Sequence, residues 1–290
     1  MSDLKQITIV SGKGGTGKTT TVAAFAALSE DKVIADCDVD ASNLYLLMHP
    51  NDTEQGEFVG AKIAVRDEDA CMKSGMCEKH CRFEAITVDE VDELACEGCG
   101  MCVVVCPTNA LRLQPVVVGH WFTGECKYGP MAHARLLPAA ESSGRLVTLV
   151  RQKAENLAYE HDLPLILIDG PPGLGCTTTA ALADADMAVV LTEPTLSGIH
   201  DMERQIQMVE HFGQRSAIII NKADLNSENA QRLRTWCAQK DLPILGEIPW
   251  DPTVTDALAQ EMPLVEHNDG PAAQAMREAW ERTADLIASL

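Results

Sequence analysis

The chain has 290 residues, 46% of them hydrophobic, and carries 43 Asp and Glu against 23 Lys and Arg, a net charge of −20. A chain of this length can bury a substantial core, and one large domain with an insertion is expected rather than two independent domains. The acidic balance excludes nonspecific nucleic-acid binding, which needs a basic face to neutralise phosphates, and it equally disfavours an anionic membrane surface.

Cysteine content and hydropathy indicate the compartment. The chain contains 11 cysteines, and the spacing of several of them points to reduced, metal-bound thiols rather than disulfides. No signal peptide and no apolar run of about 18 residues is present. The stretch 272–290 balances its basic residues with acidic ones, which is typical of a packed terminal helix rather than a membrane anchor. We therefore expect a cytoplasmic protein without a membrane anchor or a nucleic-acid partner.

Apolar runs typical of buried parallel strands alternate with helical stretches along most of the chain. In chain order, the expected strands are residues 4–10, 32–36, 165–169, 187–192, 217–221 and 244–249. The expected helices are residues 18–29, 142–161, 176–184, 198–212, 227–239, 252–260 and 271–288. This alternation predicts an α/β fold, with a doubly wound, mostly parallel sheet covered by helices on both faces.

The first expected strand leads directly into a phosphate-binding loop. Its glycines let backbone amides close around phosphate oxygens, and the helix that follows directs its N-terminus at the anion. Lys18 is expected to contact the β- and γ-phosphates, the Thr19 hydroxyl to bind Mg2+, and Thr20 to lie near the α-phosphate. The predicted phosphate-binding residues are Gly12, Lys13, Gly14, Gly15, Thr16, Gly17, Lys18, Thr19 and Thr20.

A cysteine-rich segment, residues 60–113, interrupts the alternation. The segment contains two cysteine runs, residues 71–81 and residues 96–106. The second run follows the pattern C-x2-C-x2-C-x3-C-P of bacterial two-cluster ferredoxins, in which the fourth cysteine ligates the other cluster. A zinc site with four cysteines would instead show two separated C-x2-C knuckles. The segment is therefore predicted to be a small inserted α+β, ferredoxin-like domain with iron–sulfur clusters. It divides a nucleotide-binding domain formed by residues 1–59 and 114–290.

The first cysteine run departs from this pattern, because Ser74 occupies the second ligand position. In the crossed arrangement, cluster 1 takes Cys71, Cys77 and Cys106. Cluster 2 takes Cys81, Cys96, Cys99 and Cys102. A serine oxygen is a harder ligand than a thiolate and is normally protonated, so cluster 1 is predicted to be a [3Fe-4S] or a labile [4Fe-4S] cluster. The alternative is a single surviving cluster, with the cysteines of the first run left over.

Further motifs resemble a known family. Lys13 looks like the additional lysine of the deviant phosphate loop in the MinD and ParA group, which also includes the nitrogenase iron protein. Residues 36–40 look like the first switch, residues 168–173 like the second, and residues 220–224 like the strand end that recognises the base. The resemblance covers nearly the whole chain. With its insertion, the chain is similar to MinD-superfamily ATPases that carry an inserted ferredoxin domain.

The resemblance implies a mechanism. Lys13 would reach across a nucleotide-sandwich homodimer to the partner's phosphates and stabilise the charge that develops in phosphoryl transfer, alongside Lys18. Asp38 would polarise the attacking water, and Asp169 would hold a water molecule of Mg2+. The chain would be an ATPase, slow without its partner.

The resemblance also implies how the base is bound. Asn221 would contact the adenine edge through its side-chain amide, and Pro249 would pack near the base, although a plain turn proline accounts for Pro249 equally well. Residues 221–224, Asn-Lys-Ala-Asp, also fit a guanine-specific pattern. The preference for ATP over GTP therefore rests on the resemblance.

Three functions fit this combination. In the first, ATP binding and hydrolysis reshape a dimer and gate electron transfer from the clusters to an unknown redox partner. In the second, the protein is a maturation or carrier factor for an iron–sulfur or other metal centre. In the third, it is a spatial organiser of the MinD or ParA kind, with redox-sensing clusters.

Overall fold

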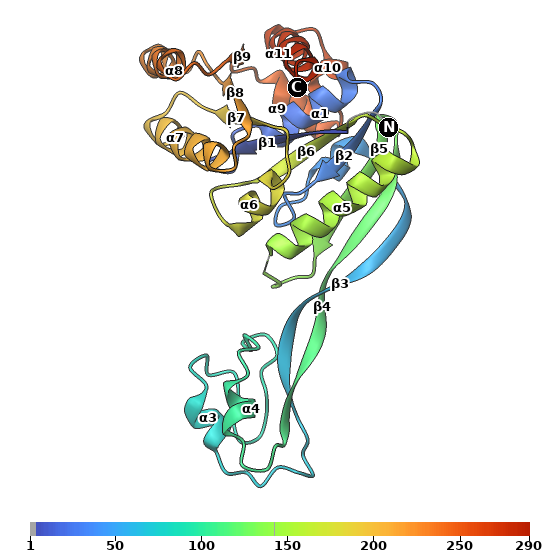
Figure 1. Ribbon diagram of the computed structural model, residues 1–290, viewed down its shortest axis with the longest axis vertical. Helices are drawn as coiled ribbons and strands as arrows, with labels where there is room; N and C mark the ends of the chain where they lie inside the picture. Colours follow the sequence, from blue (N-terminus) through green and yellow to red (C-terminus); the bar gives the residue numbers. More distant parts are fainter. Residues whose placement is uncertain (1–3, 142) are drawn as a thin grey trace. The chain divides into compact units, whose positions relative to one another are not determined.

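The computed structural model describes residues 4–141 and 143–290 (Figure 1). It contains two compact units. The first, called here the nucleotide unit, draws on Met1–Gln55, Trp121–Arg135 and Ser142–Leu290; the second, called the cysteine unit, draws on Gly56–His120 and Leu136–Glu141. No helix in the described part of the chain is both long and apolar enough to cross a membrane.

The nucleotide unit contains the parallel sheet that the sequence predicts. Its central order is β2-β6-β1-β7-β8-β9, and each neighbouring pair is parallel. The strands are β1 (Lys5–Ser11), β2 (Lys32–Asp36), β6 (Leu165–Pro172), β7 (Met187–Thr192), β8 (Arg215–Asn221) and β9 (Ile244–Ile248). All six expected strands are present, with bounds that shift by a few residues at most.

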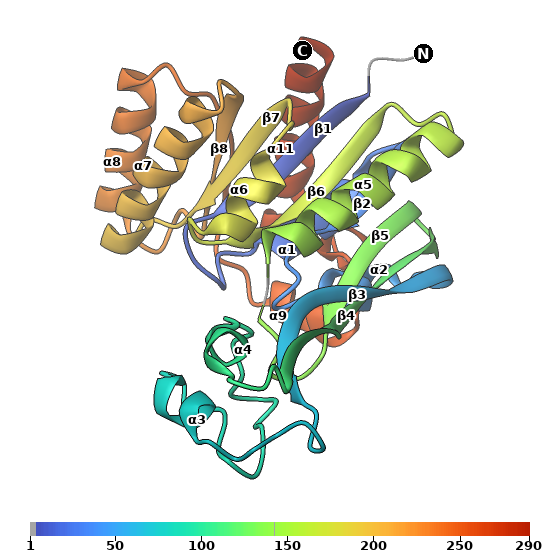
Figure 2. The same cartoon turned by 60° about the horizontal axis from the view of Figure 1, so that its bottom comes forward.

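Helices cover both faces of this sheet (Figure 2). One face packs against α1 (Lys18–Leu28), α2 (Leu44–Met48), α9 (Thr253–Ala259), α10 (Leu264–His267) and α11 (Pro271–Ala288). The other face packs against α5 (Gly144–Glu160), α6 (Cys176–Leu182), α7 (Leu196–His211) and α8 (Ser227–Gln239). The expected terminal helix is therefore α11, and its Trp280 ring lies 5.2 Å from that of Phe25 in α1.

Alternation along the strands explains why the sheet is buried on both sides. In β7, Val189 faces the core under α1 and α11, whereas Ala188 and Val190 face the core under α6 and α7. In β8, Ile219 faces the core under α1 and α11, and Ile218 faces the opposite core. Successive side chains of a strand point to opposite faces, so a strand buried on both must be apolar throughout.

Three strands were not expected from the sequence. These are β3 (Asn51–Arg66), β4 (Leu111–Cys126) and β5 (Gly129–Leu136), which continue the sheet in the order β3-β4-β5-β2. Most of β3 is exposed, so it is held by backbone pairing and shows no apolar period. The short helices α2 and α10 and the two short helices of the cysteine unit were also missed. The cysteine unit is longer than the segment 60–113 because parts of β3 and β4 belong to it.

The cysteine unit has an internal repeat with an offset of 25 positions. Its two helices, α3 (Met76–His80) and α4 (Met101–Val105), both follow a left-handed glycine, Gly75 at φ 70° and Gly100 at φ 75°. Under this offset Ser74 corresponds to Cys99. The structure thus supports the register in which Ser74 stands at a cysteine position.

Hydrogen bonds tie the two halves of the repeat together reciprocally. The backbone N–H of Asp67 donates to the carbonyl of Ala110, and the equivalent N–H of Asp92 donates to the equivalent carbonyl of Ala85, both at 2.8 Å. A small core lies between the halves, formed by the buried Ala64, Ile86 and Leu111. Each half therefore completes the other.

Candidate nucleotide site and cysteine pockets

The phosphate-binding loop requires glycine where the backbone turns left-handed. Gly15 has φ 78° and Gly17 has φ 92°, the latter directly before α1. A Cβ on Gly17 would lie 2.5 Å from Nδ2 of Asn221. A side chain there would strain the backbone and also displace the neighbouring strand end.

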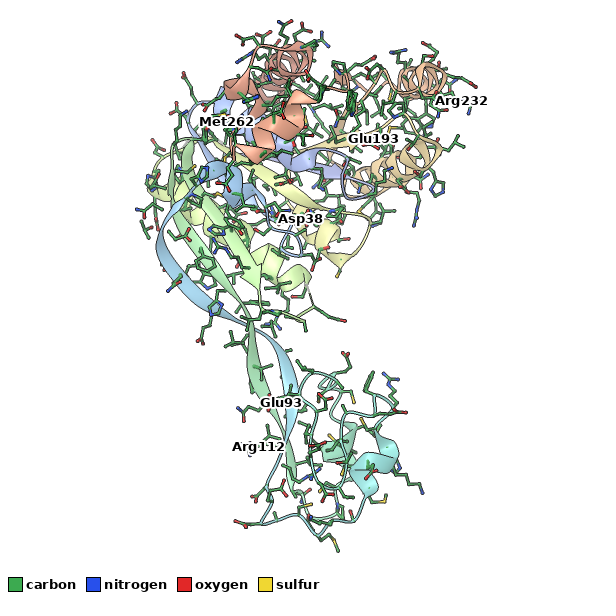
Figure 3. All side chains as sticks on the ribbon, turned by 180° about the vertical axis from the view of Figure 1, so that it is seen from behind. Asp38, Glu93, Arg112, Glu193, Arg232 and Met262 are labelled. Carbon is green, nitrogen blue, oxygen red and sulfur yellow. The ribbon has the colours of Figure 1, made fainter. Side chains whose placement is uncertain are left out.

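Lys18 and Asp38 face each other in the site. Lys18 opens α1, is 5% exposed, and places Nζ 3.8 Å from Oδ2 of Asp38. Burial raises the pKa of the Asp38 carboxyl, although the charge of Lys18 opposes this. Oδ1 of Asp38 is buried without a hydrogen-bond partner in the described structure; the residue is labelled in Figure 3. The Lys18 ammonium and the Asp38 carboxylate are therefore positioned to contact a bound ligand.

Thr19 and Asp169 form the second contact. The Thr19 hydroxyl donates to Oδ2 of Asp169 at 2.8 Å, and Asp169 is wholly buried in β6. Burial raises the pKa of Asp169 to about 7, against the opposing effects of Lys18 and the Thr19 hydrogen bond. Its Oδ1 has no hydrogen-bond partner in the described structure. A hydroxyl and two carboxylates with free oxygens suit Mg2+, which prefers hard oxygen ligands and keeps several waters.

Asp36, at the end of β2, is engaged within the protein. Its Oδ2 accepts a hydrogen bond from the Ser42 hydroxyl at 2.7 Å, and its Oδ1 accepts one from the Asp38 N–H at 3.2 Å. Burial and the charge of Asp169 raise the pKa of Asp36 well above its ordinary value. Asp36 therefore orders the segment after β2, which resembles the first switch, and has little free capacity for a ligand.

Beside the loop lies an open pocket for the rest of a nucleotide. It is lined by loop residues, by Asn221 and Pro249, and by Trp250, Val254 and Leu258. The Asn221 amide is largely used within the protein, because Nδ2 donates to the carbonyl of Thr16 at 2.8 Å and Oδ1 accepts from the Lys222 N–H at 2.9 Å. Asn221 thus joins β8 to the phosphate-binding loop, and only part of its amide is left for a base.

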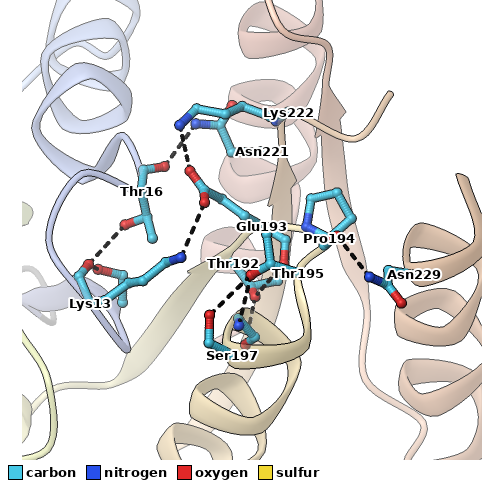
Figure 4. Close-up of polar contacts among 12 residues, drawn as sticks. Lys13, Thr16, Thr192, Glu193, Pro194, Thr195, Ser197, Asn221, Lys222 and Asn229 are labelled. Atoms are coloured by element: carbon cyan, nitrogen blue, oxygen red, sulfur yellow. Dashed lines mark hydrogen bonds and ion pairs between the residues drawn. The ribbon is translucent and has the colours of Figure 1, made fainter. Parts of the chain in front are cut away.

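Glu193 is a site residue that sequence reasoning missed. It follows β7, and its carboxylate lies 3.5 Å from Nζ of Lys13 and 2.5 Å from Nζ of Lys222 (Figure 4). The signal available was its position, since side chains at the carboxyl ends of parallel strands gather at one edge of the sheet. Glu193 connects the phosphate-binding loop to the end of β8.

Gln205, in α7, was missed as well. It is completely buried, and its Nε2 donates to the carbonyls of Ser11 at 3.1 Å and Gly173 at 2.7 Å. It joins the end of β1 to the segment after β6 that resembles the second switch. No local pattern marks it, because its partners lie far away in the sequence.

Two separate pockets in the cysteine unit divide the predicted ligands between them. One is lined by Cys71, Ser74, Cys77 and Cys106. The other is lined by Cys81, Cys96, Cys99 and Cys102. This is the crossed division expected from the spacing, with Ser74 in the wall of the three-cysteine pocket.

The cysteine sulfurs receive backbone hydrogen bonds. The Ala110 N–H donates to Sγ of Cys106 at 3.3 Å, and the Ala64 N–H donates to Sγ of Cys96 at 3.4 Å. Burial raises the pKa of the Cys106 thiol, but the surrounding N–H groups outweigh it and lower the pKa overall. The described cysteines are free thiols. Within the described ranges, no three His, Cys, Asp or Glu side chains are grouped tightly enough to hold a single metal ion.

Comparison with known proteins assigns the nucleotide unit. The family model of the CobQ/CobB/MinD/ParA nucleotide binding domain matches residues 7–264. The chain belongs to this family. It is a MinD/ParA-family P-loop ATPase, which confirms the resemblance to the MinD and ParA group seen in the sequence.

Two relatives of this ATPase come from one archaeon. The uncharacterized protein MJ0578 of Methanocaldococcus jannaschii is 29% identical over 287 residues, covering 98% of each chain. A second protein of that organism, the uncharacterized ATP-binding protein MJ0547, is 28% identical over 277 residues, covering 94% of this chain and 84% of its own.

Solved structures show the same fold. The septum site-determining protein MinD of Pyrococcus horikoshii, complexed with Mg-ADP, superimposes with a TM-score of 0.61 at 19% identity, covering 99% of the ATPase and 98% of that chain. An ATP complex of a Cyanothece McdA variant gives a TM-score of 0.60 at 15% identity, with 99% and 98% covered. The predicted P-loop fold with a mostly parallel sheet is confirmed.

Proposed function

We propose that this ATPase is a nucleotide-driven switch that also carries two iron–sulfur centres, and that it couples its nucleotide state to electron transfer to a redox partner. The observation that carries the proposal is the division of the cysteines: each predicted ligand set lines its own pocket. The ATPase site in the same chain supplies the switch.

Within the nucleotide site, the proposed roles follow from the contacts. Lys18 neutralises the β- and γ-phosphates, and its partner Asp38 is released to orient the attacking water. Thr19 and Asp169 hold Mg2+ and one of its waters; when bound, the ion neutralises charge on the phosphates. The similar MinD structure is a complex with Mg-ADP and the similar McdA structure is a complex with ATP, which supports Mg2+ and ATP as the ligands of this site.

The proposal includes an ATP-dependent homodimer. Lys13 is the residue proposed to cross to the partner's phosphates, and its side chain is 38% exposed while Glu193 holds it at 3.5 Å. A lysine that is partly exposed and held by one ion pair can be redirected at modest free-energy cost. Asn221 and Pro249 are proposed to border the adenine, and both line the pocket.

The residues of the cysteine unit fit iron–sulfur centres. In such a centre each thiolate binds a different iron, so the ligands surround a volume rather than a point, and N–H groups directed at sulfur tune the potential. Residues 60–113 are proposed to act as a ferredoxin-type domain in a cytoplasmic protein, where free thiols persist. When bound, the centres supply one-electron transfer.

Anaerobic reconstitution with iron and sulfide tests the proposal. Wild-type protein should bind seven or eight irons, as the three-cysteine pocket takes a three-iron or a four-iron centre. Cys99→Ala should lose the irons of the four-cysteine pocket, whereas Cys237→Ala, which removes a buried thiol of the nucleotide unit, should lose none. Iron content near zero in the folded wild type would refute the proposal.

A second function, delivery of an iron–sulfur or other metal centre, is favoured by Ser74. A pocket with three thiolates and one hydroxyl holds its metal more weakly and releases it more easily. Nucleotide-dependent transfer of radioactive iron to an apo-ferredoxin would support delivery. Retention of all iron during turnover would leave electron transfer as the function.

A further inference from the structure

We propose that Arg66 makes the two centres unequal: it places a buried positive charge against the three-cysteine pocket and raises the reduction potential of the centre held there. This inference rests on the proposed function, because it assumes that both pockets hold iron–sulfur centres. It adds which pocket has its reduction potential raised by a buried cation and which residue supplies that cation.

Arg66 is buried without a compensating carboxylate in close contact. Its side chain is 3% exposed. Its NH1 donates to the carbonyl of Val88 at 2.8 Å and its NH2 to that of Thr87 at 2.5 Å, and both acceptors are neutral. Its nearest carboxylate in the described structure, that of Glu68, lies 3.9 Å away on a side chain that is 65% exposed.

One N–H donor of the guanidinium, at Nε, has no partner in the described structure. Nε of Arg66 is buried and makes no hydrogen bond in the described structure. The long contact with the exposed Glu68 compensates the buried charge only weakly, and a buried N–H without an acceptor is destabilising. An anion beside the guanidinium would therefore stabilise Arg66 in this position.

The pocket beside Arg66 would contain that anion. Arg66 lines it together with Cys71, Cys77 and Cys106. Cysteines that bind iron are thiolates, so an occupied pocket is negatively charged. Lys73 also lines this pocket, but its exposed ammonium is already paired with Asp89 at 3.0 Å. Arg66 is thus the buried cation that faces the centre.

The internal repeat provides the comparison. The position equivalent to Arg66, 25 residues later, is Val91, which packs against the small apolar core of the unit. The four-cysteine pocket is lined by apolar residues such as Phe83 and by the acidic Glu97, with no Lys or Arg among its described lining residues. The two halves therefore have the same backbone but different charge.

A positive charge beside one centre changes its reduction equilibrium. Reduction adds a negative charge, which a nearby cation stabilises and a nearby carboxylate destabilises, and screening is weak where water is excluded. Net charge and hydrogen bonding are among the factors that set cluster potentials. Arg66 should therefore raise the potential of the three-cysteine pocket above the value it would have with a neutral residue.

The test compares four reconstituted proteins: wild type, Arg66→Gln, Arg66→Lys and Arg112→Gln. Arg112 is an exposed arginine of β4 in the same unit and is the matched control (Figure 3). Both potentials are measured by redox titration followed by electron paramagnetic resonance. Arg66→Gln should lower the reduction equilibrium constant of the three-cysteine centre at least tenfold, about 59 mV for one electron. The other centre should shift much less, and Arg112→Gln should shift neither centre comparably.

The outcomes separate this inference from the proposed function. Wild-type protein that binds no iron would refute the proposed function itself. Loaded protein whose three-cysteine potential is unchanged in Arg66→Gln, or in which Arg112→Gln produces the same shift, would overturn the role of Arg66 alone. If Arg66→Gln cannot be reconstituted with iron, Arg66→Lys provides the test. Arg66→Lys should bind iron and keep the wild-type order of the two potentials. A reversed order, or a failure of Arg66→Lys to bind iron, would overturn the inference.

Discussion

Glu193 holds Lys13 beside its own phosphate-binding loop, with Oε2 3.5 Å from Nζ, while the same carboxylate binds Lys222 of the β8 end. The lysine proposed to act on a partner's nucleotide is therefore held within its own subunit. The proposed dimer would have to break or rearrange this ion pair, so we expect Glu193 to oppose the dimer until nucleotide is bound.

Replacing Glu193 by Gln should release Lys13. An exposed or half-exposed pair contributes about 0.2 to 1 kcal/mol, and each of the two subunits breaks one such pair, so the ATP-dependent dimer should form at up to about thirtyfold lower protein concentration. Analytical ultracentrifugation with a nonhydrolysable ATP analogue measures this, and Glu210→Gln on the exposed face of α7 is the control. A weaker dimer in Glu193→Gln would mean that Glu193 is needed in the dimer rather than opposed to it.

Substitution of the two lysines of the loop should have different effects on nucleotide affinity and on hydrolysis. Lys18→Ala removes the buried ammonium that faces Asp38 at 3.8 Å, and Mg-ATP affinity should fall at least a hundredfold. Lys13→Ala should keep affinity within about threefold of the wild type but lose dimer-dependent hydrolysis, because its proposed target lies in the other subunit. Calorimetry and ATPase assays over a range of protein concentrations measure both quantities. Equal loss of affinity in the two variants would contradict the cross-dimer role.

The Ser74→Cys substitution tests the three-cysteine pocket. Ser74 stands 25 positions before Cys99 and lines the pocket with Cys71, Cys77 and Cys106. A thiol there should complete the ligand set, raise the iron content to eight, and remove any [3Fe-4S] signal from the oxidised protein. Ser227→Cys adds an exposed thiol in the nucleotide unit and should change nothing. Unchanged iron content and spectra in Ser74→Cys would show that position 74 is not a ligand position.

Local sequence predicted those parts of the molecule that depend on near neighbours. The strands of the parallel sheet are apolar throughout, and the loop before Lys18 must have glycine, so both are visible in the sequence. The division of the cysteines followed from spacing alone, because each ligand run is short. For the same reason Ser74 could be assigned to the pocket that it lines with three cysteines, and its place as a ligand position stays a prediction.

The remaining features depend on tertiary contacts that no local pattern encodes. Glu193 and Gln205 act on residues more than 25 positions away. The strand β3 is largely exposed and is held by pairing, so an apolar period could not reveal it. Arg66 gave no signal, because a single arginine near the end of a polar strand is normally solvated; its burial and its unpartnered Nε appear only in the structure.

His133 should make the stability of the nucleotide unit depend on pH. Its ring is completely buried between Tyr45 and Phe122, with Nε2 2.9 Å from Oδ1 of Asp52. Burial lowers the pKa of His133, although the Asp52 hydrogen bond opposes this. The unfolded chain, with a histidine pKa of about 6.5, then binds more protons than the folded one, so the free energy of unfolding should fall as pH drops below about 6.5.

Urea unfolding at several pH values measures this dependence. His133→Leu should be less stable than the wild type at pH 7.5, and its free energy of unfolding should fall less between pH 7 and pH 5. The exposed His211 provides the control, since His211→Gln should keep the wild-type pH dependence. A steeper loss of stability at low pH in His133→Leu than in the wild type would contradict a lowered pKa of His133 in the folded protein.

The most direct test of the central claim is the reduction potential of each iron–sulfur centre without nucleotide, with Mg-ADP and with a nonhydrolysable Mg-ATP analogue. Binding linkage requires that a nucleotide which shifts a potential has an affinity that depends equally on the redox state. The proposed switch predicts that the ATP analogue shifts at least one potential by about 59 mV or more, equivalent to a tenfold change in nucleotide affinity. Identical potentials in all three states would contradict coupling between the ATPase and the cysteine unit.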